Sequence, residues 1–160
     1  MDTANLTQTT EKKMAGLEQW MAPFFAKLPH LPPNARQTIV TIAPMLALIF
    51  GILGLFVILT GGVIASLLSI VSIVMLADGL RPLLLLIALL AGGIAAALDL
   101  LAYKPLAARK KKGWNYLFYG TVLTTCSAIL EVVFGAGTLG SIIGALLGFW
   151  LLFEVRGLYQ

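Results

Sequence analysis

The chain has 160 residues, of which 59% are hydrophobic and only 11% are charged, and its formal net charge is +4. Soluble globular domains contain about 45–50% apolar and about 25% charged residues, so this composition excludes an ordinary water-soluble fold. The basic residues flank long apolar runs, which indicates membrane orientation rather than nucleic-acid binding. The sequence therefore predicts an all-α integral membrane protein, a polytopic helical bundle.

The first 38 residues differ from the remainder, so we expect a cytoplasmic N-terminal region (1–38) and a transmembrane helical domain (39–160). Apolar residues recur in the N-terminal region at a spacing of three to four, which predicts an amphipathic helix: Met14, Leu17, Met21, Phe24, Phe25 and Leu28. Such a helix lies in the lipid headgroup layer or packs on the protein's own cytoplasmic end. Pro29, Pro32 and Pro33 predict a stiff connection to the first span. Because the region has no apolar run followed by a small-residue cleavage site, we expect no cleavable signal peptide.

Five apolar segments follow: Ile39 to Leu59, Val63 to Ala77, Pro82 to Tyr103, Trp114 to Phe134, and Thr138 to Phe153. A membrane-crossing helix needs about 20 residues, with roughly 17 as a lower limit. The first, third and fourth segments meet this length. The fifth continues through Glu154 and Val155, so we expect it to cross as well.

Positive charges set the orientation, because short cytoplasmic loops carry an excess of Lys and Arg. The basic residues precede the first segment, separate the third from the fourth and follow the fifth, and Arg81 stands alone. If the second segment does not cross, every basic residue except Arg81 becomes cytoplasmic. The sequence therefore predicts four transmembrane helices with both termini in the cytoplasm.

The second segment, residues 63–77, has its own reason to remain at the surface. Ser66, Ser69 and Ser72 recur every three residues and would form a polar stripe on a helix. We interpret the segment as a short non-crossing helix, interfacial or re-entrant, on the outer side. The alternative is a fifth crossing whose serines bond to carbonyls of their own helix.

A glycine zipper lies in the fifth segment, where Gly140, Gly144 and Gly148 are four residues apart. Small residues at this spacing let another helix approach closely. The third segment contains residues with matching spacing, including Gly92 and Ala96. The pattern predicts packing within the chain, and a contact between subunits is the alternative.

Asp99 and Glu131 are carboxylates inside apolar segments, where an unpaired charge is costly. Asp99 lies near the cytoplasmic end within reach of Lys104, and Glu131 lies near the outer end, so the two cannot form a pair. We interpret them as interfacial anchors, with an ion path through one of them as the alternative. The hydroxyls of the fourth segment are expected to bond to helix carbonyls, with a polar translocation path as the alternative: Thr121, Thr124, Thr125 and Ser127.

A basic loop next to the membrane follows the third segment and consists of Lys104, Arg109, Lys110, Lys111 and Lys112. Each such charge near an anionic leaflet is worth about 1 kcal/mol. We therefore expect this loop to bind the head groups of anionic lipids.

The sequence carries no motif of a catalytic, phosphate-binding or metal-binding site. The only histidine, His30, lies in the proline-rich connection, which argues against histidine-ligated haem or pigment in the membrane, and the only cysteine is Cys126. We therefore expect no catalytic residues, no metal and no cofactor, and the chain is not expected to be an enzyme.

The stretch from Gly113 to Tyr119 and the ending from Gly148 to Arg156, with the glycine zipper between them, resemble small uncharacterised multi-pass membrane proteins of bacteria. This resemblance covers the C-terminal half. It implies a location in the bacterial inner membrane and transfers no functional residue.

The leading functional hypothesis is a structural or accessory membrane protein that packs into a larger assembly or organises lipids and partner proteins. Its expected partners are membrane lipids and other membrane-protein subunits or further copies of the chain, and not nucleic acid. The alternative is a small transporter or channel that works as a homo-oligomer and uses Asp99 or Glu131.

Overall fold

The computed structural model describes residues 3–62, 64, 67, 70–71, 81–134 and 138–160. These residues are predominantly helical. The elements are α1 (Thr3–Phe25), α2 (Pro33–Val57), the π-helical turn η1 (Ile58–Gly62), α4 (Arg81–Ala107), α5 (Lys111–Val133), α6 (Leu139–Val155) and the 3-10 turn η2 (Arg156–Leu158).

Four helical stretches are long and apolar enough to cross a membrane: Pro33–Gly62, Leu86–Ala107, Lys111–Val133 and Leu139–Leu158. In the most apolar part of each stretch, at most 22% of the residues are buried inside the protein. Large apolar side chains such as Phe50, Leu90 and Leu139 are mainly exposed. Contiguous apolar surface of this extent is rare on soluble monomers. The prediction of an all-α chain with four helices able to span a membrane is confirmed.

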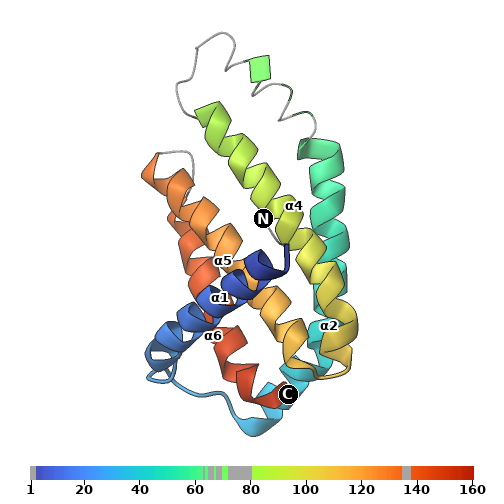
Figure 1. The fold of residues 1–160 in the computed structure, drawn as a ribbon, viewed down its shortest axis with the longest axis vertical. Helices are drawn as coiled ribbons and strands as arrows, with labels where there is room; N and C mark the ends of the chain where they lie inside the picture. The colour runs from blue at the N-terminus through green and yellow to red at the C-terminus, as the bar shows by residue number, and fades with distance from the viewer. Residues whose placement is uncertain (1–2, 63, 65–66, 68–69, 72–80, 135–137) are drawn as a thin grey trace.

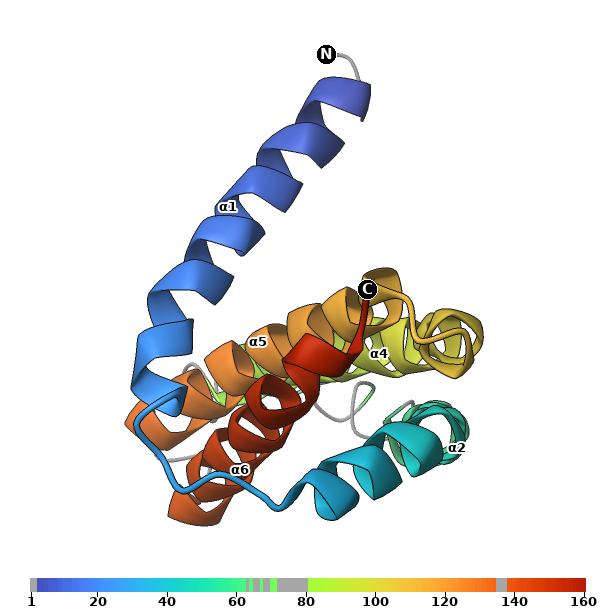
Figure 2. The ribbon, with the colours of Figure 1, turned by 90° about the horizontal axis from the view of Figure 1, so that it is seen from below.

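The four long helices run side by side and alternate in direction (Figure 1). We call the end where α2 and α5 begin and α4 and α6 end the basal end. Each long helix packs against the next one along the chain, whereas α2 and α6 contact each other much less. Seen from the basal end, α2 and α6 therefore form the two edges of an arc in which α4 and α5 are the middle (Figure 2).

Glycines allow the closest approaches in this arc. A Cβ atom at Gly51 of α2 would lie 2.7 Å from Leu100 of α4, and one at Gly113 of α5 would lie 2.6 Å from the backbone nitrogen of Leu106. Gly120 of α5 faces Ala95 of α4 at van der Waals distance. Close backbone approach lets membrane helices gain dispersion contacts, so α4 packs through small residues on both of its sides.

An aromatic cluster holds the basal half together. Trp114 stacks on Phe118 with ring centroids 5.2 Å apart, and Phe118 meets Phe149 of α6 at 6.0 Å. The Trp114 indole N–H donates a hydrogen bond of 2.7 Å to the Leu152 carbonyl. Phe25 of α1 stacks on Phe153 of α6 at 4.8 Å. The cluster therefore joins α5, α6 and α1.

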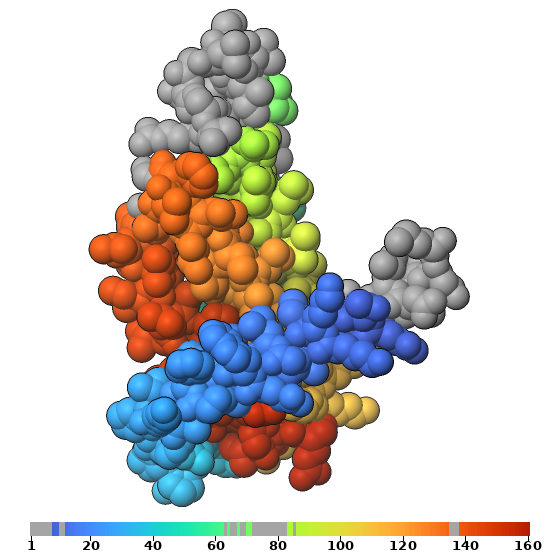
Figure 3. Space-filling model, turned by 60° about the vertical axis from the view of Figure 1, so that its left-hand side comes forward, coloured from blue at the N-terminus to red at the C-terminus, as the bar shows by residue number. Residues whose placement is uncertain are grey.

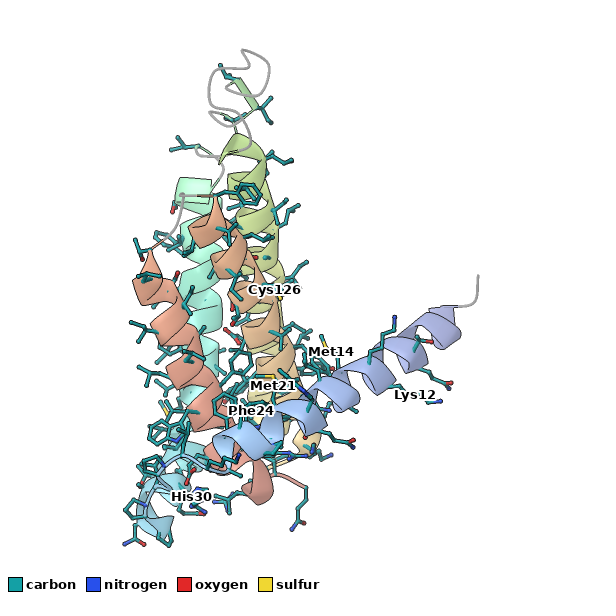
Figure 4. All side chains as sticks on the ribbon, turned by 90° about the vertical axis from the view of Figure 1, so that its left-hand side faces the viewer. Lys12, Met14, Met21, Phe24, His30 and Cys126 are labelled. Carbon is teal, nitrogen blue, oxygen red and sulfur yellow. The ribbon has the colours of Figure 1, made fainter. Side chains whose placement is uncertain are left out.

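Helix α1 crosses the bundle near the basal end instead of running parallel to the spans (Figure 3). Leu17, Met21 and Phe25 pack against the buried core. Met14 and Met21 project from the side of α1 toward the spans, and Lys12 projects from the other side (Figure 4). Trp20 and Phe24 remain 65% and 59% exposed. Of the two locations predicted for this helix, packing on the protein's own end is therefore present.

The spans differ from their predicted bounds mainly at α2. This helix begins at Pro33, a first-turn position that proline favours, so the predicted boundary at residue 38 lies inside a helix. Ile64, Leu67, Ile70 and Val71 are helical. The serine stripe of Ser66, Ser69 and Ser72, and with it the prediction of a short non-crossing helix, lies outside the described residues.

Candidate functional site

A cavity of about 260 Å³ lies between α2 and α6, with α4 and α5 behind it. Apolar residues of α2 form one wall, including Leu46 and Phe50, and apolar residues of α6 form the other, including Leu151 and Leu152. It lies where the arc of helices is least closed. It is also where the structure brings a charged side chain, Asp99, against apolar walls.

Asp99 stands out in this lining because nothing in the described part of the chain forms a hydrogen bond or an ion pair with it. Two other polar side chains of the lining, those of Thr121 and Trp114, have hydrogen-bond partners. Thr121 donates its hydroxyl to the Leu117 carbonyl at 2.8 Å, and Trp114 is bonded to Leu152. The cavity thus presents one unpaired carboxylate in apolar surroundings.

The expected contact between Asp99 and Lys104 is not formed, since no ion pair joins the two side chains. Asp99 lies eight residues before the end of α4, and Glu131 lies near the far end of α5. With a rise of about 1.5 Å per residue and antiparallel helices, the two carboxylates lie toward opposite ends of the bundle. The prediction that they cannot form a pair agrees with this arrangement.

The hydroxyls of α5 bond within their own helix. Thr124 donates to the Gly120 carbonyl, Thr125 to the Thr121 carbonyl at 2.6 Å, and Ser127 to the Leu123 carbonyl. This is the arrangement expected from the sequence, and it is common for hydroxyls in membrane helices. These groups are therefore engaged within α5.

The glycine zipper does not form the contact with α4 that was predicted. Gly92 lies near Ile58, and Ala96 packs on Gly54 of α2. No described atom lies within 4 Å of a Cβ at Gly144, and Gly140 meets only Thr138. The reason is the rotation of α6: Phe149 and Phe153 follow Gly144 by five and nine residues, which places them on the opposite face of the helix. The aromatic cluster packs that face inward.

Two carboxylates at the basal end were not identified from the sequence. Glu154 of α6, with a side chain only 3% exposed, lies 2.6 Å from Arg36 Nε and 3.1 Å from His30 Nδ1. It also accepts a 2.7 Å hydrogen bond from the Leu31 N–H. Glu154 therefore fixes the proline-rich connection and the start of α2 to the end of α6.

Glu18 of α1 plays the corresponding part on the other side of the basal end. One of its oxygens lies 2.8 Å from Lys111 Nζ and 2.6 Å from Arg156 Nε. Its side chain is 10% exposed. Glu18 therefore ties α1 to the start of α5 and to the end of α6.

A sequence signal for both carboxylates exists. Glu18 falls on the apolar face of α1, four residues after Met14 and three before Met21. Glu154 ends an otherwise apolar span. Acids in such positions need basic partners, but the partners come from distant parts of the chain and periodicity does not identify them.

The basic loop is partly engaged. Lys111 pairs with Glu18, and Lys112 lies 5.8 Å over the Tyr116 ring. The C-terminal residue Gln160 pairs with the loop through two backbone hydrogen bonds, one to Arg109 and one to Lys111. Lys104, Arg109, Lys110 and Lys112 are exposed. The charges that remain available to lipid head groups are fewer than the sequence indicated.

The chain matches no protein-family model, no curated protein and no solved structure. The described residues nevertheless show four features that bear on function: the four spans, the open strip of α6, the basal ion pairs and the cavity at Asp99.

Proposed function

We propose that the protein is a structural or accessory component of the bacterial inner membrane, with four crossings and both termini in the cytoplasm. All Lys and Arg residues of the chain except Arg81 belong to segments at or next to the basal end. The positive-inside rule then makes the basal end cytoplasmic. The bacterial inner membrane is part of the proposal and follows from the resemblance expected from the C-terminal half of the sequence.

The observation that carries the accessory role is the open strip of small residues on α6. Gly140 and Gly144 have space where a Cβ would lie, and Ser141 beside them is exposed. Small residues without a partner helix in the same chain offer a surface on which another transmembrane helix can pack. We assign this surface to a neighbouring subunit, with a second copy of this chain as the partner to be tested.

The basal end supports a second part of the proposal, contact with the lipid surface. Trp20 and Phe24 form an exposed aromatic pair with centroids 5.2 Å apart on the flank of α1. Aromatic side chains favour the membrane interface. The exposed Lys104, Lys110 and Lys112 would meet anionic head groups at the same level. Helix α1 would thus lie in the headgroup layer with one flank on the protein and the other on lipid.

The transporter alternative has less support from the geometry. The hydroxyls of α5 are bonded to their own helix. Asp99 and Glu131 lie toward opposite ends. The described residues therefore offer no continuous line of polar groups along the bundle.

The test compares Gly144→Leu with Gly61→Leu. Both glycines have nothing in the described chain within 4 Å of a Cβ, but only Gly144 belongs to the strip. Oligomeric state would be measured by light scattering in mild detergent. Disulfide crosslinking in membranes, through a cysteine at Ser141 in a Cys126→Ser background, would report the same contact before extraction.

For the protein with an unmodified strip and for Gly61→Leu, we expect crosslinked dimers in membranes and a mass above that of the monomer in light scattering. Gly144→Leu should lose both and keep the helix content of the parent protein by circular dichroism, because the substitution has room inside the subunit. A protein that is monomeric in membranes and detergent would contradict the proposed contact. An oligomer that persists unchanged in Gly144→Leu would contradict it as well.

A further inference from the structure

The cavity at Asp99 combines a carboxylate with walls that are almost entirely apolar. We propose that it binds a small organic cation with an apolar body, such as an aromatic quaternary ammonium. The binding site is independent of the assembly role proposed above.

Asp99 differs from the acids Glu18 and Glu154 in having no basic partner. Glu18 and Glu154 each contact two basic side chains. Asp99 has no partner in the described chain; it is partly exposed, and it lies eight residues from the basal end of its helix, whereas Glu154 lies one residue from the end of α6. An ionised carboxylate in apolar surroundings is costly unless a cation or a donor accompanies it. A cationic ligand would supply the missing partner.

The side chains that line the cavity indicate which kind of cation would bind there. Metal ions such as Ca²⁺ and Mg²⁺ take about six or more oxygen ligands, and the described residues contain no group of three or more His, Cys, Asp or Glu that could hold a metal. The residues around Asp99 instead include Phe50, Leu117 and Leu151. Such walls favour an organic body over a hydrated or metal ion.

The volume of the cavity and the distance of Asp99 from the basal end limit the size and type of the ligand. Pockets for drug-sized ligands measure roughly 300–1,000 Å³, so a cavity of about 260 Å³ suits a cation of about ten non-hydrogen atoms. Asp99 lies eight residues, about 12 Å along the helix, from the basal end of α4. The amine of a phospholipid remains in the headgroup layer, so a compact lipophilic cation is the better match.

Access is provided by the two edges of the arc. Leu46 and Phe50 on α2 and Leu151 on α6 line the cavity and are also exposed on the bundle surface. A lipophilic cation dissolved in the bilayer could therefore enter between α2 and α6. Its charge would meet Asp99 on the far side of the cavity, and its apolar body would lie against the walls.

The experiment measures binding of radiolabelled benzyltrimethylammonium to the full-length protein in nanodiscs of zwitterionic lipid, by equilibrium dialysis against empty nanodiscs. Four proteins are compared: the unmodified chain, Asp99→Asn, Glu131→Gln and Ala43→Phe. Asp99→Asn retains the side-chain shape, Glu131→Gln removes a carboxylate outside the cavity, and Ala43→Phe fills a cavity-lining position. The uncharged isostere neopentylbenzene serves as the competitor.

We expect saturable binding to the unmodified chain and to Glu131→Gln. Loss of a desolvated charge partner should weaken binding to Asp99→Asn by at least about tenfold, and Ala43→Phe should bind weakly because its ring occupies the cavity. Neopentylbenzene should not displace the cation. The proposal is overturned if the unmodified chain shows no saturable binding, or if Asp99→Asn binds as tightly as the unmodified chain.

Discussion

Glu154 lies 2.6 Å from Arg36 Nε, and the two residues belong to the end of α6 and the start of α2. The contact joins the two edges of the helical arc at the basal end, where α2 and α6 otherwise touch little. The same carboxylate holds the Leu31 N–H and His30. Closure of the arc at this end therefore depends on a polar contact.

Replacement of Glu154 by Gln should destabilise the bundle by about 1–2 kcal/mol, less than the roughly 3–5 kcal/mol typical of a broken buried pair, because Arg36 and His30 are partly exposed. Unfolding in mixed detergent and SDS micelles would measure the change. His30→Gln should have a smaller effect, since His30 is 57% exposed. Equal stability of Glu154→Gln and the parent chain would show that the contact contributes nothing.

Glu18→Gln should release α1 from the bundle without affecting the spans, because Glu18 pairs with both Lys111 and Arg156. Protease cleavage between α1 and α2 should become about tenfold faster or more, as expected when local opening costs about 1.4 kcal/mol less. Lys12→Gln, which changes an exposed charge on the same helix, is the control. An unchanged cleavage rate in Glu18→Gln would mean that apolar packing alone holds α1.

The spans themselves were predictable because they depend on local composition. The α4, α5 and α6 helices lie within a few residues of the predicted apolar segments. The start of α2 was not predictable in this way. A proline-rich run favours a stiff connection, but proline is also favourable in the first turn of a helix, and Pro33 begins α2. Both roles, the stiff connection and the first turn of a helix, follow from the fixed φ angle of proline.

The site was predictable only in part. Asp99 was identified from its position in an apolar segment, but the cavity beside it depends on the splay of α2 and α6. The roles of Glu18 and Glu154 depend on contacts across 93 and 124 positions of the chain. The orientation of the glycine strip depends on which face of α6 the aromatic cluster packs, and glycine spacing alone does not determine that choice.

The membrane topology can be tested with single cysteines in a Cys126→Ser background, so that every thiol that reacts is an introduced one. Lys12, Lys112 and Gln160 are exposed positions on α1, in the basic loop and at the C-terminal end, and Thr138 is exposed at the opposite end. A membrane-impermeant thiol reagent should label only the cysteine at Thr138 in intact cells and all four after lysis. Lys112 is preferable to its neighbour Gly113, which is buried against α4. Labelling at position 12 in intact cells would reverse the proposed orientation.

Two glycine-to-alanine substitutions should differ in their effect on stability. A Cβ at Gly113 would lie 2.6 Å from the backbone nitrogen of Leu106 and 2.9 Å from the Pro105 carbonyl carbon, atoms that cannot move without shifting α4. Gly113→Ala should therefore cost about 1–3 kcal/mol, the usual range for overpacking. A Cβ at Gly144 has free space, and alanine replaces a flexible residue within a helix. The Gly144→Ala variant should therefore be as stable as the parent chain or more stable by up to about 1 kcal/mol. Unfolding of both variants in SDS titrations measures the difference. Equal midpoints would show that α4 and α5 are less closely packed than the structure indicates.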